Sequence, residues 1–182
     1  MVSSRTEHDL LGTREVPSAV YYGIHTLRAV ENFPITGRRI SGYPELINAL
    51  AAIKQAAALS NRDLGLLDAT KASAIIAACE DIRSGQLHDQ FVVDVIQGGA
   101  GTSTNMNANE VIANRALEHL GRQRGEYTAL HPIDHVNMGQ STNDVYPTAL
   151  RIAAIHGVNH LTDAMSVLQK AFVAKRGNFM TS

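Results

Sequence analysis

The carboxyl-terminal part of the chain contains the pattern that most constrains its fold. Apolar residues recur there at alternating spacings of four and three, at Ala154, Val158, Leu161, Met165, Leu168 and Phe172. This spacing predicts one long helix that begins near Asn143 and continues toward Lys175. A heptad-like stripe keeps facing its neighbours only when long helices pack nearly parallel, so the helix is expected to belong to a bundle.

Long partners for this helix are missing from the preceding sequence, whose helical patterns are shorter. The 182 residues suffice for one domain, or for one domain and part of another. We therefore expect other subunits or further sequence to cover the stripe. The alternative is a single helix that caps a compact domain.

Three shorter helices are predicted before the long one. The first begins at Pro44, which suits a first helical turn, and ends near Asn61. Asp68 is placed to cap the second, which stops before Gly85, and the third ends at Gly121. Their apolar positions are Leu46, Leu50, Ile53 and Ala57 in the first, Ile75, Ile76, Cys79 and Ile82 in the second, and Met106, Val111, Ile112, Ala116 and Leu120 in the third.

Two segments have weaker patterns. The first forty residues are predicted to be irregular, because prolines and glycines interrupt each short apolar run. Residues 91–96 are compatible with a short strand or with a buried helix, and the run is too short to decide.

Charge and cysteine content exclude several classes of protein. The chain has 16 Lys+Arg against 17 Asp+Glu and no basic run, so nucleic-acid binding is not expected. No stretch reaches the roughly 18 apolar residues of a membrane helix, and the first residues do not resemble a secretory signal. The single cysteine, Cys79, lies in an apolar run and should behave as a small hydrophobe. A cytoplasmic location is therefore expected.

A glycine-rich loop at residues 97–110 precedes the third helix. Its glycines permit close backbone approach, and the free N–H groups of the next helix would face a bound anion. A carboxylate is favoured over a phosphate, because the loop has no lysine of the kind that a P-loop needs. An ordinary capped turn is the alternative.

A second polar loop, residues 131–148, precedes the long helix. Ser141, Thr142, Asn143 and Asp144 stand at the helix start, where a hydroxyl could serve only as a cap. Two helix starts that carry neutral hydrogen-bond donors would nevertheless suit a small dianion, which hydrogen bonds and helix dipoles would hold.

Metal binding is not expected at the histidine pairs of the chain. His131 with His135, and His156 with His160, have a four-residue spacing but lack the glutamate of the zinc-protease motif. His156 and His160 are instead expected on the polar face of the long helix.

The two loops resemble two signature segments of the aspartase/fumarase superfamily. The matching stretches are residues 98–107, Gly-Gly-Ala-Gly-Thr-Ser-Thr-Asn-Met-Asn, and residues 140–144, Gln-Ser-Thr-Asn-Asp. Residues 8–12, 15–17 and 21–33 also resemble the amino terminus of aspartases, so the similarity runs from about Glu7 to about Phe172. Tyr-Gly-Ile-His-Thr at residues 22–26, Thr-Ser at 102–103 and Ser-Thr at 141–142 favour aspartases over fumarases.

The resemblance implies a mainly α fold, with an amino-terminal lyase domain at residues 1–141. Residues 142–182 would be the truncated start of a central helical bundle. It also implies a carbon–nitrogen lyase that reversibly converts L-aspartate to fumarate and ammonia without a cofactor. Family members are longer and form homotetramers whose active sites are shared between subunits. A fumarate hydratase-like member and a non-catalytic assembly module are the alternatives.

The resemblance also assigns substrate-binding residues. Ser141 and Thr142 should bind the side-chain carboxylate of the substrate, and Thr102 and Asn143 should contact its amino group. The catalytic base, a serine in a mobile loop, is expected beyond Ser182, so this chain alone should be inactive. Ile133 stands where the family usually has asparagine, which weakens the expectation of a second carboxylate site at His131.

Overall fold

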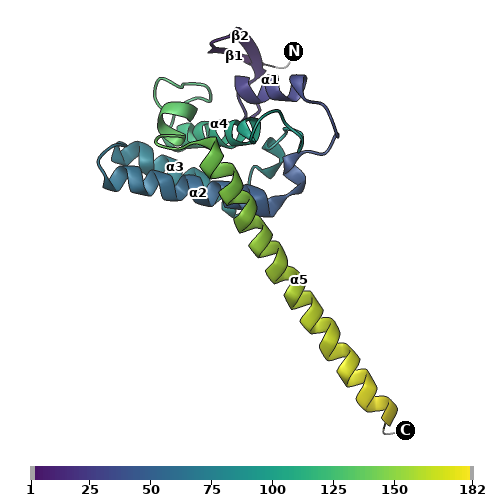
Figure 1. Ribbon diagram of the computed structural model, residues 1–182. Coiled ribbons are helices and arrows are strands. Elements are labelled where there is room, and N and C mark those ends of the chain that lie inside the picture. Colours follow the sequence, from purple (N-terminus) through teal and green to yellow (C-terminus); the bar gives the residue numbers. More distant parts are fainter. Residues whose placement is uncertain (1–2, 181–182) are drawn as a thin grey trace.

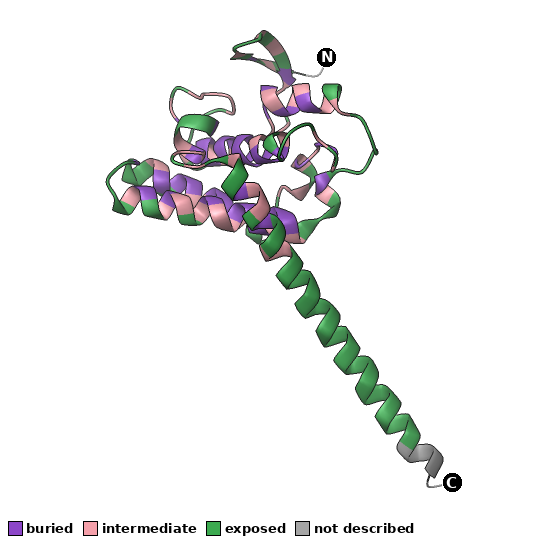
Figure 2. Ribbon diagram, in the orientation of Figure 1, coloured by how far each residue is buried: buried purple, intermediate pink, exposed green. Residues whose placement is uncertain are grey.

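The long helix at the carboxyl end is the largest element of the structure. The computed structural model describes residues 3–180, with side chains through residue 176, and α5 spans Thr142–Met180. The helix starts against the body of the molecule and then projects away from it (Figure 1). Residues 154–176 are all exposed, with Val158 and Leu161 each 60% and Phe172 68% exposed (Figure 2). The alternative of a helix that caps a compact domain is therefore wrong; residues 181–182 lie outside the described part.

Three helices form the centre of the body and confirm the mainly α expectation. They are α2 (Pro44–Asp63), α3 (Ala69–Arg83) and α4 (Thr102–His119). α2 and α3 pack side by side, α4 contacts both, and the first turns of α5 lie across α2 (Figure 1). Fully buried side chains at their centre are Ile47, Leu50, Ile75, Ile82, Ile112 and Leu117. None of the helices in the described residues is long and apolar enough to cross a membrane.

Local capping explains where these helices begin and end. The Asp68 carboxylate accepts hydrogen bonds from the backbone N–H groups of Thr70 and Lys71, at 2.9 and 3.0 Å, as the sequence predicts for an N-cap. Gly85 and Gly121 follow the ends of α3 and α4 with φ of 96° and 69°. The three predicted helices are thus confirmed, with α2 two residues longer than expected.

The expectation of an irregular amino-terminal region is wrong. Strands β1 (Ser4–Asp9) and β2 (Gly12–Pro17) form an antiparallel hairpin, and α1 (Ile24–Asn32) follows. Contacts to distant residues hold these elements: the Arg5 guanidinium donates to the carbonyls of Pro17, Val20 and Tyr22. A local apolar pattern could not predict elements that are stabilised in this way.

Residues 91–96 form neither a regular strand nor a helix. The segment is linked to Arg39 by an isolated bridge at Asp94. The Asp94 carboxylate accepts the backbone N–H groups of Thr36 and Gly37, at 2.7 and 2.8 Å. Short 3₁₀ helices η1 (Ile40–Gly42) and η2 (His88–Gln90) flank this junction, and a π-helical turn, η3 (Pro132–Val136), precedes α5.

Candidate functional site

The two polar loops meet at the amino ends of α4 and α5. Nδ2 of Asn105, in the first turn of α4, donates to Oγ1 of Thr142, the first residue of α5, at 3.1 Å. The loops also touch at Gly101, where an added Cβ would lie 2.4 Å from the Tyr146 ring. Gly101 has φ of 82°, so both its backbone conformation and its neighbour require glycine. Two helix amino ends, each with partial positive charge, therefore lie close together.

Three of the four predicted binding residues are exposed, and the fourth is half-buried. The exposed residues are Thr102, Ser141 and Asn143, and the half-buried one is Thr142. Ser141 Oγ accepts the backbone N–H of Asn143 at 3.2 Å, so Ser141 also caps α5. Its O–H, and that of Thr142, whose oxygen accepts from Asn105, remain free to donate to a ligand. The structure thus brings the starts of α4 and α5 together at the Asn105–Thr142 contact.

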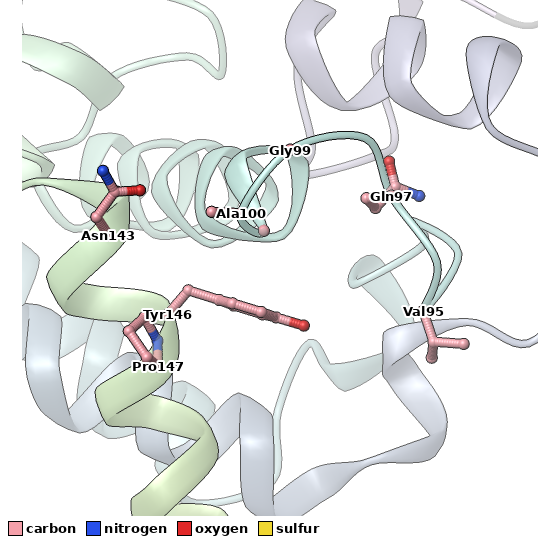
Figure 3. A pocket seen from close by; sticks show the side chains of 8 residues that line it. Val95, Gln97, Gly99, Ala100, Asn143, Tyr146 and Pro147 are labelled. Atoms are coloured by element: carbon pink, nitrogen blue, oxygen red, sulfur yellow. The ribbon is translucent and has the colours of Figure 1, made fainter.

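A pocket of about 260 Å³ lies between the loops (Figure 3). The Tyr146 ring extends beneath Ala100 toward the Val95 side of the pocket (Figure 3). Asn143 is the one predicted binding residue that lines it; the remaining lining residues are Val95, Gln97, Gly99, Ala100, Gly101, Tyr146 and Pro147. Thr102, Ser141 and Thr142 do not line the pocket, although Thr102 and Thr142 are each next in sequence to a residue that does.

A buried network of asparagine side chains lies on the interior side of Thr142, and the sequence patterns did not predict it. Asn137 Oδ1 accepts from Lys54 Nζ at 2.8 Å, from Asn105 Nδ2 at 3.1 Å and from Asn109 Nδ2 at 3.3 Å. Lys54 and Asn109 are 0% exposed and Asn105 is 1% exposed. Asn137 Nδ2 in turn donates to the carbonyl of Gln140, two residues before the start of α5.

The position of Lys54 carried a signal that could have revealed this network. Lys54 follows Leu50 by four residues and precedes Ala58 by four, so a helical period places it on the buried face of α2. The predicted stripe instead continued through Ile53 and Ala57, which are only half-buried. A lysine that shares the helical period of buried apolar residues therefore indicates a buried polar network.

Burial perturbs two titratable groups in this region. Desolvation lowers the pKa of Lys54 from 10.5 to about 7. Cys79 is 0% exposed, and burial raises the pKa of its thiol to about 12. Cys79 is therefore a protonated, buried thiol, in agreement with its expected role as a small hydrophobe.

The histidines play local roles in this structure. His131 Nδ1 accepts the backbone N–H groups of Ile133 and Asp134, at 3.1 and 3.2 Å, and so caps the π-helical turn. Those N–H groups are consequently occupied. His135 Nε2 lies 2.9 Å from Lys71 Nζ, and burial lowers the pKa of His135. His156 and His160 are exposed on α5. Across the described residues, no group of three or more His, Cys, Asp or Glu side chains could hold a metal ion.

Comparison with known proteins identifies the family. A family model described as Lyase matches residues 12–181. The chain belongs to this lyase family. Over 177 residues, this lyase chain is 58% identical to an aspartate ammonia-lyase from Pseudomonas fluorescens, an alignment that covers 97% of the chain and 37% of that relative.

Solved structures of related proteins share the fold of the lyase chain. A fumarate lyase:delta crystallin from Brucella melitensis, bound to cobalt, matches with a TM-score of 0.92 and 57% identity, over 95% of this chain and 38% of that one. A class II fumarase from Schistosoma mansoni matches with a TM-score of 0.78 and 39% identity, over 83% and 32%. The aspartase/fumarase-type fold is confirmed, and the lyase chain spans 32 to 38% of the length of these relatives.

Proposed function

We propose that the protein to which this chain belongs is an aspartate ammonia-lyase, and that the chain contributes one part of its substrate site. The observation that carries the proposal is the contact between Asn105 and Thr142, which joins the two loops at 3.1 Å. The identity of 58% to an aspartate ammonia-lyase, over nearly the whole chain, supports this activity over other lyase reactions. Residues 1–141 would form the amino-terminal lyase domain, and residues 142–182 the start of the bundle.

The proposed site holds a four-carbon dianion with neutral donors. Ser141 and Thr142 donate hydroxyl protons to the side-chain carboxylate of L-aspartate, and Thr102 and Asn143 contact its amino group. Removal of the proton next to that carboxylate produces an enediolate-like intermediate with extra negative charge. Donors aimed at this charge stabilise the transition state, and each is worth about 2.7 to 4 kcal/mol. The amino ends of α4 and α5 add favourable partial charge.

None of the four proposed binding residues is suited to remove the proton. Thr142 Oγ1 already accepts the Asn105 amide, and Ser141 Oγ accepts the backbone N–H of Asn143, so neither has a basic partner in the described residues. The base is therefore proposed to lie outside this chain, in a homotetramer whose sites combine residues of several subunits. The exposed apolar side chains of α5 are consistent with such an assembly.

A chimeric enzyme tests the proposal. This chain would replace the aligned segment of the Pseudomonas fluorescens relative, with the junction inside α5. The chimera should form fumarate from L-aspartate, monitored by the ultraviolet absorbance of fumarate, and Ser141→Ala should lower kcat/KM by about 10²- to 10³-fold. A folded tetrameric chimera that releases no ammonia would contradict the assignment.

A fumarase-like activity is the second candidate, because the Schistosoma mansoni fumarase is also 39% identical. Incubating the chimera with fumarate and ammonium, or with fumarate and water alone, separates the two reactions. Formation of L-aspartate without malate supports the lyase, and malate formation supports the hydratase.

A further inference from the structure

Lys54 is a buried cation that the proposed binding residues do not explain. Its side chain is 0% exposed within the body, so segments outside this chain have no surface of Lys54 to contact. Among the described residues, Nζ has one hydrogen-bond partner, Asn137 Oδ1 at 2.8 Å, and no carboxylate within ion-pair distance. An ammonium group has three N–H donors, so this environment satisfies it poorly.

The groups that surround Lys54 supply no counter-charge. From α3 it faces Cys79, whose buried thiol stays protonated near neutral pH. In the segment before α5 it donates to the neutral amide of Asn137, whose oxygen also accepts from Asn105 and Asn109 of α4. A lone buried ammonium destabilises a fold, whereas an apolar side chain of the same length would not. Residues that lower stability in this way are concentrated at functional sites.

A continuous chain of hydrogen bonds connects Lys54 to the proposed site. The ammonium donates to Asn137 Oδ1, and one amide nitrogen, Asn105 Nδ2, donates at 3.1 Å to both Asn137 Oδ1 and Thr142 Oγ1. Because an ammonium can only donate, it compels Asn137 to present its oxygen, and Asn105 must then present its NH₂ group. Thr142 Oγ1 therefore accepts from the interior, which leaves its O–H free to donate to a ligand.

Two buried oxygens without hydrogen-bond partners among the described residues indicate that Lys54 imposes the orientation of these amides. Asn105 Oδ1 is buried and has no hydrogen-bond partner in the described structure, and the same holds for Asn109 Oδ1. Leaving a buried carbonyl oxygen unpaired costs free energy, so the amides do not adopt these orientations for their own stability. The Lys54 ammonium requires the Asn137 oxygen as its acceptor, and this requirement accounts for both unpaired oxygens.

We propose that Lys54 is a positioning residue for dicarboxylate binding: through Asn137 and Asn105 it orients the Thr142 hydroxyl, and its charge compensates the bound dianion. This inference rests on the proposed function. The site binds the dianion better when Lys54 is protonated than when it is neutral, and the bound dianion in turn favours protonation of Lys54. Dicarboxylate affinity should therefore fall as the pH rises through the Lys54 pKa.

Succinate, a four-carbon dianion that cannot lose ammonia, is the probe. Its binding to the folded chimera would be measured by calorimetry at several pH values from 6.5 to 9, beside Lys54→Met. Lys71→Met is the matched control, because it also removes one lysine charge but contacts His135 and not the amide network. Asn137→Asp is a second variant, in which a carboxylate next to Lys54 supplies the counter-charge locally.

The unsubstituted chimera should bind succinate about tenfold more tightly at pH 6.5 than at pH 9. Lys54→Met should weaken binding at pH 6.5 about tenfold and abolish the dependence on pH, and Asn137→Asp should also weaken binding. Lys71→Met should bind as the unsubstituted protein does. If a folded Lys54→Met protein keeps the affinity for succinate and its pH dependence, the inference is wrong. If Lys54→Met does not fold, unchanged succinate binding by Asn137→Asp contradicts the inference instead.

A different result would contradict the proposed function. If the unsubstituted chimera forms no fumarate, the activity assignment is wrong, whatever Lys54 does. If it forms fumarate and the Lys54→Met variant binds succinate normally at every pH, only the role of Lys54 is wrong.

Discussion

At the scale of single residues, burial of Lys54 links the stability of this chain to pH. The pKa of Lys54 is about 7 in the folded chain, against an ordinary value of 10.5. Between these pH values the unfolded chain binds a proton that the folded chain has released, so stability rises with pH across this window. Below pH 7 the folded and the unfolded chain both carry the Lys54 proton, so the folded chain bears the full free-energy cost of the buried charge.

Replacing this lysine should therefore stabilise the chain. Lys54→Met removes the buried charge and keeps a similar volume, with an expected gain of about 4 to 5 kcal/mol below pH 7 that vanishes above pH 10.5. Urea unfolding at pH 6.5 and 9.5 measures this effect. Lys71→Met should keep the unsubstituted pH dependence, and a Lys54→Met variant that is equally stable or less stable at pH 6.5 would refute the burial argument.

Gly101 gives a second prediction at this scale. Gly101→Ala should destabilise the chain by about 2 to 4 kcal/mol, because the methyl group would meet the Tyr146 ring at 2.4 Å and φ is 82°. Gly121→Ala is the control, because Gly121 has φ of 69° and nothing within 4 Å of an added Cβ, so it reports the backbone strain alone. Chemical denaturation compares the two, and equal losses would mean that the Tyr146 contact is unimportant.

At the scale of secondary-structure elements, one carboxylate anchors the amino end of α1. Glu110, buried on α4, accepts the backbone N–H groups of Gly23, His25 and Thr26 at 2.8, 2.9 and 3.1 Å, and the Thr26 hydroxyl at 2.6 Å. The first turn of α1 is thus capped by a side chain 84 or more residues away. This cap joins the amino-terminal region to the helical body.

Glu110→Gln should loosen α1 selectively. The neutral amide has one acceptor oxygen and an NH₂ group that faces backbone donors, so a loss of about 2 to 4 kcal/mol is expected. Hydrogen–deuterium exchange should show lost protection in residues 24–32, with α2 and α3 unchanged. Glu80→Gln, at an exposed position on α3, is the control, and uniform loss of protection across all helices would argue against a local cap.

At the scale of the whole molecule, α5 is apolar on more than one side. Besides the predicted stripe, Ile155, Val167 and Val173 are 60%, 68% and 61% exposed. A helix with apolar side chains on more than one side is normally covered by more than one neighbour. The projecting part of α5 in Figure 2 therefore indicates more than one helical partner.

The chain is consequently expected to associate in solution. Light scattering after size-exclusion chromatography should report an oligomer at micromolar concentration, and Leu161→Glu with Leu168→Glu should shift it to monomer by placing charges in the apolar stripe. Asn159→Glu with Lys170→Glu, on the side of the helix opposite the stripe, should leave association unchanged. A monomer at every concentration would contradict the packing argument.

The sequence alone determined the helices α2 to α5 and the loops that precede α4 and α5, because helical period and capping depend on residues a few positions apart. Asp68 caps α3 from two and three residues away. The tertiary structure decided which polar groups are buried and which partners they find. Lys54 meets Asn137, 83 residues away, and Gly23 meets Glu110, 87 residues away. Such pairs depend on how the elements pack, so no local pattern could reveal the amide network behind Thr142 or the hairpin and α1.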